Sequence, residues 1–231
     1  MKLIGLIGGM SHESTAVYYQ TLNRLVAQRL GGLHSARLLV WSFDFADIAE
    51  YQASGNWHQA TEDMLNAARS LKKAGAQQLL ICTNTMHYCA DDIERETGLP
   101  VCNIIDAVKD QLIANGIQQV LLLGTKYTMS MAFYRDRLSA DSGPVVTVPN
   151  EQHQAQVNDI IYDELCRGIT TETSQQTLAD IVRYYRNQRG CQAVILGCTE
   201  LGMLLDDQRC ELPCYDALQI HCHYAIDAAL K

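Results

Sequence analysis

The sequence predicts an α/β fold made of two pseudosymmetric three-layer halves, each with a mostly parallel sheet. Short runs of valine, isoleucine and leucine alternate with amphipathic stretches, which is the pattern of parallel strands joined by crossover helices. Landmarks in the first half recur in the second half at a constant offset of 115 residues. The 231 residues are 48% hydrophobic and 19% charged, so each half is able to bury a core of its own.

The expected strands are continuous apolar runs bounded by polar or glycine residues, as is typical of strands buried on both faces of a sheet. They are residues 3–7, 38–41, 78–81, 120–123, 145–148 and 193–196. The stretches between them are amphipathic and predict helices. These are residues 14–30, 58–73, 105–115, 132–138, 154–167, 174–188 and 217–230.

The two halves align in one register. Four landmarks share the offset, which favours duplication over the general likeness of any two βαβ units. We expect a first lobe of residues 1–99 and 209–231 and a second lobe of residues 100–208, with a ligand site where the carboxyl edges of the two sheets face each other. The landmark pairs are Gly9 with Gly124, Tyr18-Tyr19 with Phe133-Tyr134, Gly75 with Gly190, and residues 79–85 with 194–200.

Charge and cysteine content exclude several classes of protein. The net charge is -8 and no basic run is longer than Lys72-Lys73, which argues against nucleic-acid or anionic-membrane partners. No stretch approaches about 18 uninterrupted apolar residues, so we expect a cytoplasmic protein. The nine cysteines are scattered and odd in number, so they cannot all pair, which indicates a reduced compartment. No C-x-x-C pair is present, which argues against a structural metal. His221-Cys222-His223 is the cluster most like a metal site, but it lies in an expected helix. Neighbouring side chains diverge there, so the three cannot converge on one ion.

Polar residues follow four of the predicted strands and are the candidate site. Residues 83–85 (Thr-Asn-Thr) and 198–200 (Cys-Thr-Glu) each come directly after a buried strand, and glycine turns at residues 8–11 and 124–128 follow the first strand of each half. Helix starts at such positions bind carboxylates, although any one turn alone is explained equally well by helix capping. No dinucleotide-binding or P-loop motif is present.

These residues resemble the cofactor-independent aspartate/glutamate racemases. Residues 195–202 (Ile-Leu-Gly-Cys-Thr-Glu-Leu-Gly) are similar to the second cysteine motif of that family, and residues 82–87 (Cys-Thr-Asn-Thr-Met-His) to its first. The opening residues 7–11 (Ile-Gly-Gly-Met-Ser) are also typical of it. The resemblance implies a homodimeric isomerase without cofactor or metal, whose partner is a small amino acid such as glutamate or aspartate.

The resemblance also implies roles for individual residues. In the family, two thiols flank the substrate α-carbon; one removes the proton and the other returns it on the opposite face. Asn84, Thr85 and Thr199 match positions that hold the α-carboxylate and α-amino groups. Met10, Thr125 and Thr128 match further positions in the substrate cleft.

The chain departs from the family pattern at the first catalytic position, which is Thr83 here, with Cys82 one residue earlier. Because strand side chains alternate, Cys82 is expected to point away from a ligand that Thr83 touches. The repeat agrees, since Thr83 aligns with Cys198 and Cys82 with Gly197. Our hypothesis is that Cys198 removes the α-proton and Thr83 delivers or relays the returning one. Because the second-half cysteine of the family acts on the L-enantiomer, the resemblance implies that turnover from L to D is favoured.

Substrate identity is less constrained. The positions that hold a distal carboxylate in aspartate-specific members correspond loosely to Asp47 and Cys166, neither of which is cationic. Gln52 is a candidate hydrogen-bond donor in the same loop. Lys126 and Arg167 are possible charge partners, but a position as a solvated surface residue is favoured for each. The missing cations favour a broad substrate range.

Two other functions remain open. A malonate-type decarboxylase of the same superfamily needs only one cysteine as proton donor, and loss of one thiol is also compatible with an amino-acid-binding protein that has no turnover. His87 is a candidate proton carrier or a histidine bonded to the backbone, and Glu200 is a candidate partner of the Cys198 proton or a helix-start residue that binds its own amides.

Overall fold

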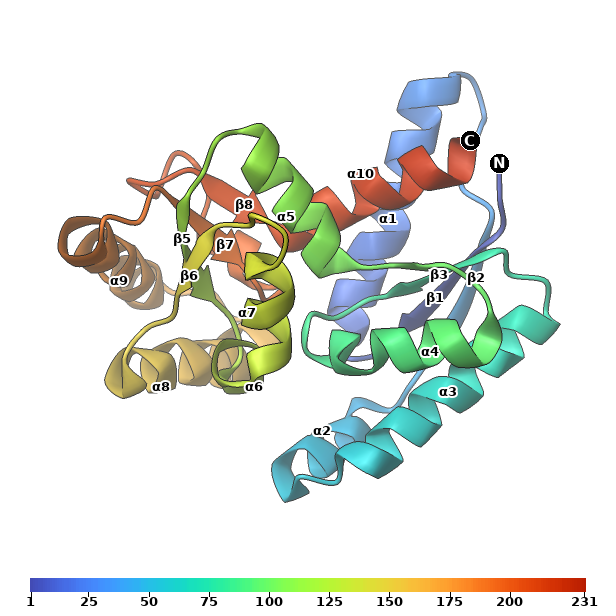
Figure 1. Ribbon diagram of the computed structural model, residues 1–231, viewed down its shortest axis with the longest axis horizontal. Coiled ribbons are helices and arrows are strands. Elements are labelled where there is room, and N and C mark those ends of the chain that lie inside the picture. The colour runs from blue at the N-terminus through green and yellow to red at the C-terminus, as the bar shows by residue number, and fades with distance from the viewer. The chain divides into compact units, whose positions relative to one another are not determined.

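Two four-stranded parallel sheets organise the chain in a computed structural model that describes all 231 residues (Figure 1). The first sheet has the order β2-β1-β3-β4 and the second the order β6-β5-β7-β8, and every strand pair is parallel. The α/β prediction is therefore confirmed. The strands are β1 Ile4–Gly8, β2 Leu38–Ser42, β3 Gln78–Ile81, β4 Val101–Cys102, β5 Gln119–Leu123, β6 Val145–Thr147, β7 Ala193–Leu196 and β8 Cys214–Asp216.

Unit 1 comprises Met1–Ile104 and His221–Lys231. Every residue of β1 and β3 is buried, so side chains cover both faces of the sheet, while β2 forms a partly exposed edge. Helices α3 and α4 lie side by side in this unit (Figure 1). Its helices are α1 His12–Leu30, α2 Phe45–Ser54, α3 Trp57–Lys73, α4 Ala90–Thr97, the 3-10 turn η1 Thr85–Cys89, and most of α10 Ala217–Leu230.

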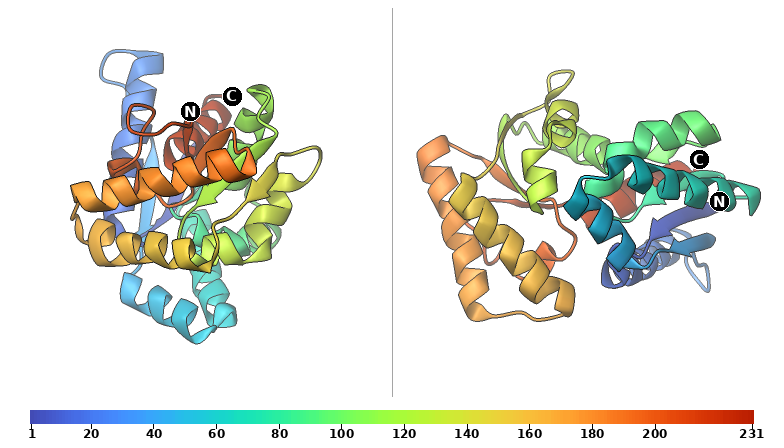
Figure 2. Two further views of the ribbon diagram at one scale, coloured as in Figure 1. Left: turned by 90° about the vertical axis from the view of Figure 1, so that its left-hand side faces the viewer. Right: turned by 90° about the horizontal axis from the view of Figure 1, so that it is seen from below.

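Unit 2 comprises Ile105–Ile220. Helices α8 and α9 run side by side (Figure 2). His153 of α8 makes edge-to-face ring contacts with Tyr184 and Tyr185 of α9. Every residue of β7 is buried in the core of this unit. The helical elements are α5 Ile104–Ala114, α6 Lys126–Ser130, α7 Ala132–Ser139, α8 Glu151–Asp159, the π turn η2 Ile160–Glu164, η3 Leu165–Arg167, α9 Glu172–Arg189 and η4 Leu201–Met203.

The two units repeat one strand order, and the repeat has the predicted offset at its two central strands. β5 begins 115 residues after β1, and β7 begins 115 residues after β3. The register slips by one residue in the following helices, because Tyr18 and Tyr134, rather than Tyr18 and Phe133, are the fully buried rings. Strands align better than helices because their main-chain hydrogen bonds fix the register.

The observed boundaries between the units differ from the predicted ones. The chain leaves unit 1 after Ile104 and returns at His221, instead of crossing at residues 99/100 and 208/209. The reason is that β4 pairs with β3 in the first sheet and β8 pairs with β7 in the second, so each short strand stays with its own sheet. No helix of the chain combines the length and the apolar character needed to cross a bilayer.

Candidate active site

A glycine turn ends β1 and starts α1 in unit 1. Ser11 caps α1 by accepting a hydrogen bond from the Ser14 amide, and the Gly9 amide donates to Thr15 Oγ1 at 2.8 Å. Gly9 has a φ of 86°, and a Cβ there would lie 2.3 Å from the Phe43 nitrogen, so only glycine fits. The predicted site residue Met10 follows this turn and is buried.

The turn after β3 separates a buried thiol from a partly exposed hydroxyl. Cys82 is fully buried, and burial raises the pKa of its thiol well above the usual range. Thr83 is half-buried, and Asn84 and Thr85 are buried. Cys82 and Thr83 both lie beyond the last residue of β3, so the bend after the strand sets this difference in exposure. A thiol with so high a pKa is no base near neutral pH.

His87 is held by main-chain groups on both ring nitrogens. The Ile104 amide donates to Nε2 at 3.1 Å, so Nε2 carries no proton. The proton is therefore on Nδ1, which donates to the Thr83 carbonyl at 2.8 Å. The ring is buried and neutral. Of the two roles left open by the sequence, this geometry matches a histidine bonded to the backbone, and it fixes the carbonyl of Thr83.

His221 makes a second main-chain tie beside His87, which the sequence analysis did not find. Its Nε2 lies 2.7 Å from the Cys102 carbonyl, so Nε2 donates and Nδ1 accepts from the Tyr18 hydroxyl at 2.8 Å. Burial, followed by the neighbouring His87, lowers the pKa of His221 to about 3. The two histidine rings meet edge to face, with centroids 5.5 Å apart. Its partners lie far away along the chain, so no local pattern signals the contact.

In unit 2 the turns after β5 and β7 touch through glycine. The Gly197 amide donates to the Leu123 carbonyl at 2.7 Å, and a Cβ on Gly197 would lie 2.8 Å from that oxygen. Thr125 caps α6, with its hydroxyl 3.3 Å from the Thr128 hydroxyl. The predicted residues Thr125, Thr128 and Cys198 therefore lie on two turns packed against each other.

Cys198 and Glu200 form the chemically distinctive pair of unit 2. The Cys198 thiol donates to Glu200 Oε2 at 3.1 Å, and the Thr199 hydroxyl donates to the same oxygen at 2.6 Å. Cys198 and Glu200 are buried, and Thr199 is half-buried. Burial first, and then Glu200, raise the pKa of Cys198 well above its usual range. The resting state is thus a protonated thiol next to a proton acceptor.

Two further groups, from the segment after α8, pack against the core cluster that contains Cys198. Burial raises the pKa of Tyr162, with a smaller contribution from Cys198, and burial followed by Glu200 raises the pKa of Cys166 to about 12. The sequence predicted one helix over residues 154–167, but α8 ends at Asp159 and the π turn η2 follows. The sequence analysis considered Cys166 only as a missing cation and did not identify Tyr162.

The residues considered for a distal carboxylate differ in their exposure and contacts. Gln52 is buried, and its Nε2 contacts Met86 Sδ at 3.4 Å, whereas Asp47 is exposed. Arg167 is exposed and lies 3.7 Å from Asp163. Lys126 is exposed over the Tyr127 ring. Of the predicted site residues, Met10, Gln52, Thr83, Asn84 and Thr85 lie in unit 1, and Thr125, Thr128, Cys198 and Thr199 lie in unit 2.

The chain is similar in sequence and in fold to known proteins. The family model described as Asp/Glu/Hydantoin racemase matches residues 7–225. The crystal structure of a candidate Asp/Glu racemase from Yersinia pestis is similar, with 46% identity, all of both chains covered and a TM-score of 0.93. An aspartate racemase homologue from Pyrococcus horikoshii has 33% identity, the same coverage and a TM-score of 0.87. The broad specificity amino-acid racemase RacX of Bacillus subtilis is 21% identical, over 93% of this chain and 92% of its own.

Proposed function

The chain belongs to the Asp/Glu/Hydantoin racemase family, and from this membership we propose that it is an amino-acid racemase that needs no cofactor. Its substrates are aspartate- and glutamate-like amino acids. The observation that carries the proposal is the buried Cys198 thiol bonded to the Glu200 carboxylate, within the motif that resembles the family's second catalytic cysteine. A base is required for α-proton removal, and this pair supplies one.

Proton transfer from Cys198 to Glu200 prepares the base. The negative charge passes from Oε2 to Sγ, so no additional charge is buried, and the thiolate then takes the α-proton of the substrate. The ammonium group of the substrate favours the same step, because a nearby cation stabilises a thiolate. We assign the binding of the α-carboxylate and α-amino groups to Asn84, Thr85 and Thr199, with Met10, Thr125 and Thr128 lining the rest of the site.

Thr83 completes the reaction on the opposite face of the α-carbon. Its hydroxyl delivers the returning proton and is reprotonated by a bound water, or relays a proton from that water, since a hydroxyl both donates and accepts. The hydroxide that remains is neutralised by the proton held on Glu200, which restores the carboxylate. Because a threonine hydroxyl is a weaker base than a thiolate, proton removal by Cys198 is the faster of the two half-reactions. The second-half cysteine of the family acts on the L-enantiomer, so by this resemblance the enzyme starts more readily from the L-enantiomer. His87 acts as a positioning residue by fixing the Thr83 carbonyl.

A broad substrate range fits the side chains available. Lys126 and Arg167 are exposed, and the amide of Gln52 contacts Met86, so these side chains offer no buried cation for a distal carboxylate. A site without such a cation discriminates weakly between side chains. The similarity to RacX, which is described as having broad specificity, supports the same proposal.

Chiral analysis of purified protein incubated with pure L-glutamate or L-aspartate tests the function. We expect the D-enantiomer to appear without added cofactor, and the protein solution to lack the yellow colour of bound pyridoxal phosphate. Cys198→Ala should abolish turnover. A wild-type protein that produces no D-enantiomer from any of a panel of L-amino acids contradicts the proposal.

Of the two catalytic motif positions, Thr83 and Cys198, only Cys198 carries a thiol. This favours one alternative function, a decarboxylase of substituted malonates. Such an enzyme needs a single proton donor, which Cys198 supplies, and no second base. Carbon dioxide release from arylmalonates, without racemisation of amino acids, identifies it. The other function left open by the sequence is an amino-acid-binding protein without turnover. Such a protein shows thermal stabilisation by amino acids and no α-proton exchange.

A further inference from the structure

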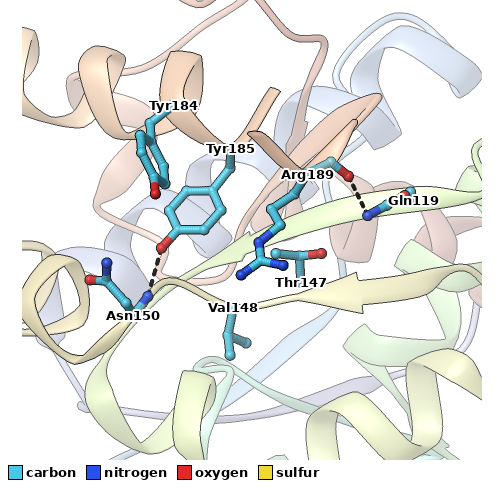
Figure 3. A pocket seen from close by; sticks show the side chains of 7 residues that line it. All are labelled: Gln119, Thr147, Val148, Asn150, Tyr184, Tyr185 and Arg189. Atoms are coloured by element: carbon cyan, nitrogen blue, oxygen red, sulfur yellow. Dashed lines mark hydrogen bonds between the residues drawn. The ribbon is translucent and has the colours of Figure 1, made fainter. Parts of the chain in front are cut away.

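A hollow of about 310 Å³ opens on unit 2, away from the turns that carry Cys198 and Thr125. Its wall includes Gln119, the first residue of β5, whereas Thr125 follows the last residue of that strand. Five residues of parallel strand span about 16 Å, so the hollow and these turns lie at opposite ends of β5. The lining residues are Gln119, Thr147, Val148, Asn150, Tyr184, Tyr185 and Arg189 (Figure 3).

Arg189 is the charged group of this hollow. Its side chain extends along the wall beside Thr147 and Val148 (Figure 3), and the lining contains no Asp or Glu. Arg189 forms no ion pair, although five other arginines of unit 2 do. Arg135 is the other arginine of unit 2 without an ion pair, and of these two Arg189 is the one that lines the hollow. Those five are Arg137, Arg167, Arg183, Arg186 and Arg209.

The walls around Arg189 are held in place before any ligand binds. The main-chain amide of Asn150 donates to the Tyr185 hydroxyl at 2.6 Å, and the side-chain Nε2 of Gln119 donates to the main-chain carbonyl of Arg189 at 2.5 Å (Figure 3). Tyr184 packs edge to face on Tyr185, with ring centroids 5.1 Å apart, and remains 47% exposed. The hollow therefore offers a guanidinium, carried on a backbone that is held in place, beside an accessible aromatic ring.

We propose that this hollow binds a small organic anion with a flat apolar part. The carboxylate or phosphate of the ligand meets the Arg189 guanidinium, whose planar fork suits either group, and the flat part lies against Tyr184. A volume near 300 Å³ is at the lower end of the range for small-molecule sites. The C-terminus of α9 contributes about half a negative charge nearby, which the full charge of Arg189 outweighs. The site does not depend on the proposed racemase activity.

Titration calorimetry with four small probes tests the proposal on the full chain. We expect benzoate and phenyl phosphate to bind saturably, inorganic phosphate more weakly, and neutral benzyl alcohol not to bind. The ratio of the benzoate and phenyl phosphate affinities shows which anion the site prefers. Arg189→Gln should weaken binding of both aromatic anions about tenfold or more, because it removes the charge and the fork.

Two further variants separate a specific site from a general charge effect. Arg186→Gln makes the same change one turn away on α9, where the arginine pairs with Glu211, and should change affinity less than about twofold. Tyr184→Ala should weaken phenyl phosphate binding and leave inorganic phosphate unchanged. Equal affinities in wild type and Arg189→Gln, tight binding of benzyl alcohol, or no saturable binding of either aromatic anion would overturn the proposal.

Discussion

Cys198 and Glu200 hold one proton between a buried thiol and a buried carboxylate, and this pair sets how the proposed reaction begins. The sequence located the pair, because Cys-Thr-Glu follows a recognisable buried strand. It left open whether Glu200 contacts the thiol or its own helix amides. Only the three-dimensional turn decides this, since the thiol and the Thr199 hydroxyl both donate to Oε2.

Replacement of Glu200 by glutamine separates two effects of that carboxylate. Glu200→Gln removes a negative charge beside Cys198, so the pKa of Cys198 should fall and the thiol should be alkylated by iodoacetamide at lower pH. Racemisation should nevertheless fall by about tenfold or more, because the carboxylate that accepts the thiol proton is gone.

The measurement is the pH dependence of alkylation, mapped to Cys198 by mass spectrometry. Glu211→Gln is the matched control, since Glu211 is a surface carboxylate of the same unit paired with Arg183 and Arg186. It should leave both the alkylation profile and the activity as in wild type. An alkylation midpoint in Glu200→Gln that stays the same or rises would show that the carboxylate does not raise the thiol pKa.

At the scale of elements, the turns after β5 and β7 bring the unit 2 site residues together because glycine lets their backbones touch. A Cβ on Gly124 would lie 3.0 Å from the Gly197 carbonyl, and one on Gly197 would lie 2.8 Å from the Leu123 carbonyl. Main-chain atoms in two hydrogen-bonded strands cannot move aside easily.

Gly197→Ala should therefore destabilise the protein and displace the next residue, Cys198. We expect a loss of about 1–3 kcal/mol in the free energy of unfolding, as for other overpacked cores, and a loss of activity larger than the unfolded fraction explains. Gly116→Ala is the control. It has open space for a Cβ but a φ of 69°, so it should cost about 1 kcal/mol and leave activity intact. Denaturant titration and racemisation assays measure both. Equal activity in the two variants would argue against this role of Gly197.

The sequence predicted the strands that begin as apolar runs and missed β4 and β8, together with the helices α2, α4 and α6. The strands β1, β3, β5 and β7 lie within one residue of their predicted ranges, because each is a continuous buried run. β4 has only two residues, which is too short for any periodic pattern, and β8 (Cys-Tyr-Asp) lacks the paired valines by which the equally short β6 was predicted. The π turn after α8 was also missed, because the apolar spacing continues through it.

At the scale of the whole molecule, two histidines of unit 1 make hydrogen bonds beside the points where the chain leaves this unit and returns to it. His87 accepts from the Ile104 amide, the last residue before unit 2, and His221 is the first residue after it. These contacts join residues up to 203 positions apart, so only the folded chain reveals them. The sequence predicted the repeat and the strand positions. It did not predict the histidine hydrogen bonds at the two points where the chain passes from one unit to the other.

Acid should destabilise the chain through His221. Its pKa is about 3 in the folded state and about 6.5 when unfolded, so between these values the unfolded state binds more protons. Stability is then lost as the pH falls, by about 2 kcal/mol from about pH 7.5 to about pH 5.

Denaturant titrations across this pH range measure the effect. His221→Gln should be less stable at neutral pH but should lose less stability on acidification than wild type does. His34→Gln removes an exposed histidine and should follow the wild-type profile. A His221→Gln profile parallel to that of wild type would show that His221 is not the group that titrates.

The central claim is that Cys198 removes the α-proton and Thr83 serves the other face, and α-deuteration in D₂O tests it most directly. Pure L- and pure D-glutamate or aspartate are incubated with wild type, Cys198→Ala and Cys82→Ala, and the initial rate of α-deuteration is followed by NMR. We predict faster exchange from the L-enantiomer in wild type, no exchange from it in Cys198→Ala, and wild-type behaviour in Cys82→Ala. Equal initial rates from both enantiomers, or full activity in Cys198→Ala, would contradict the account.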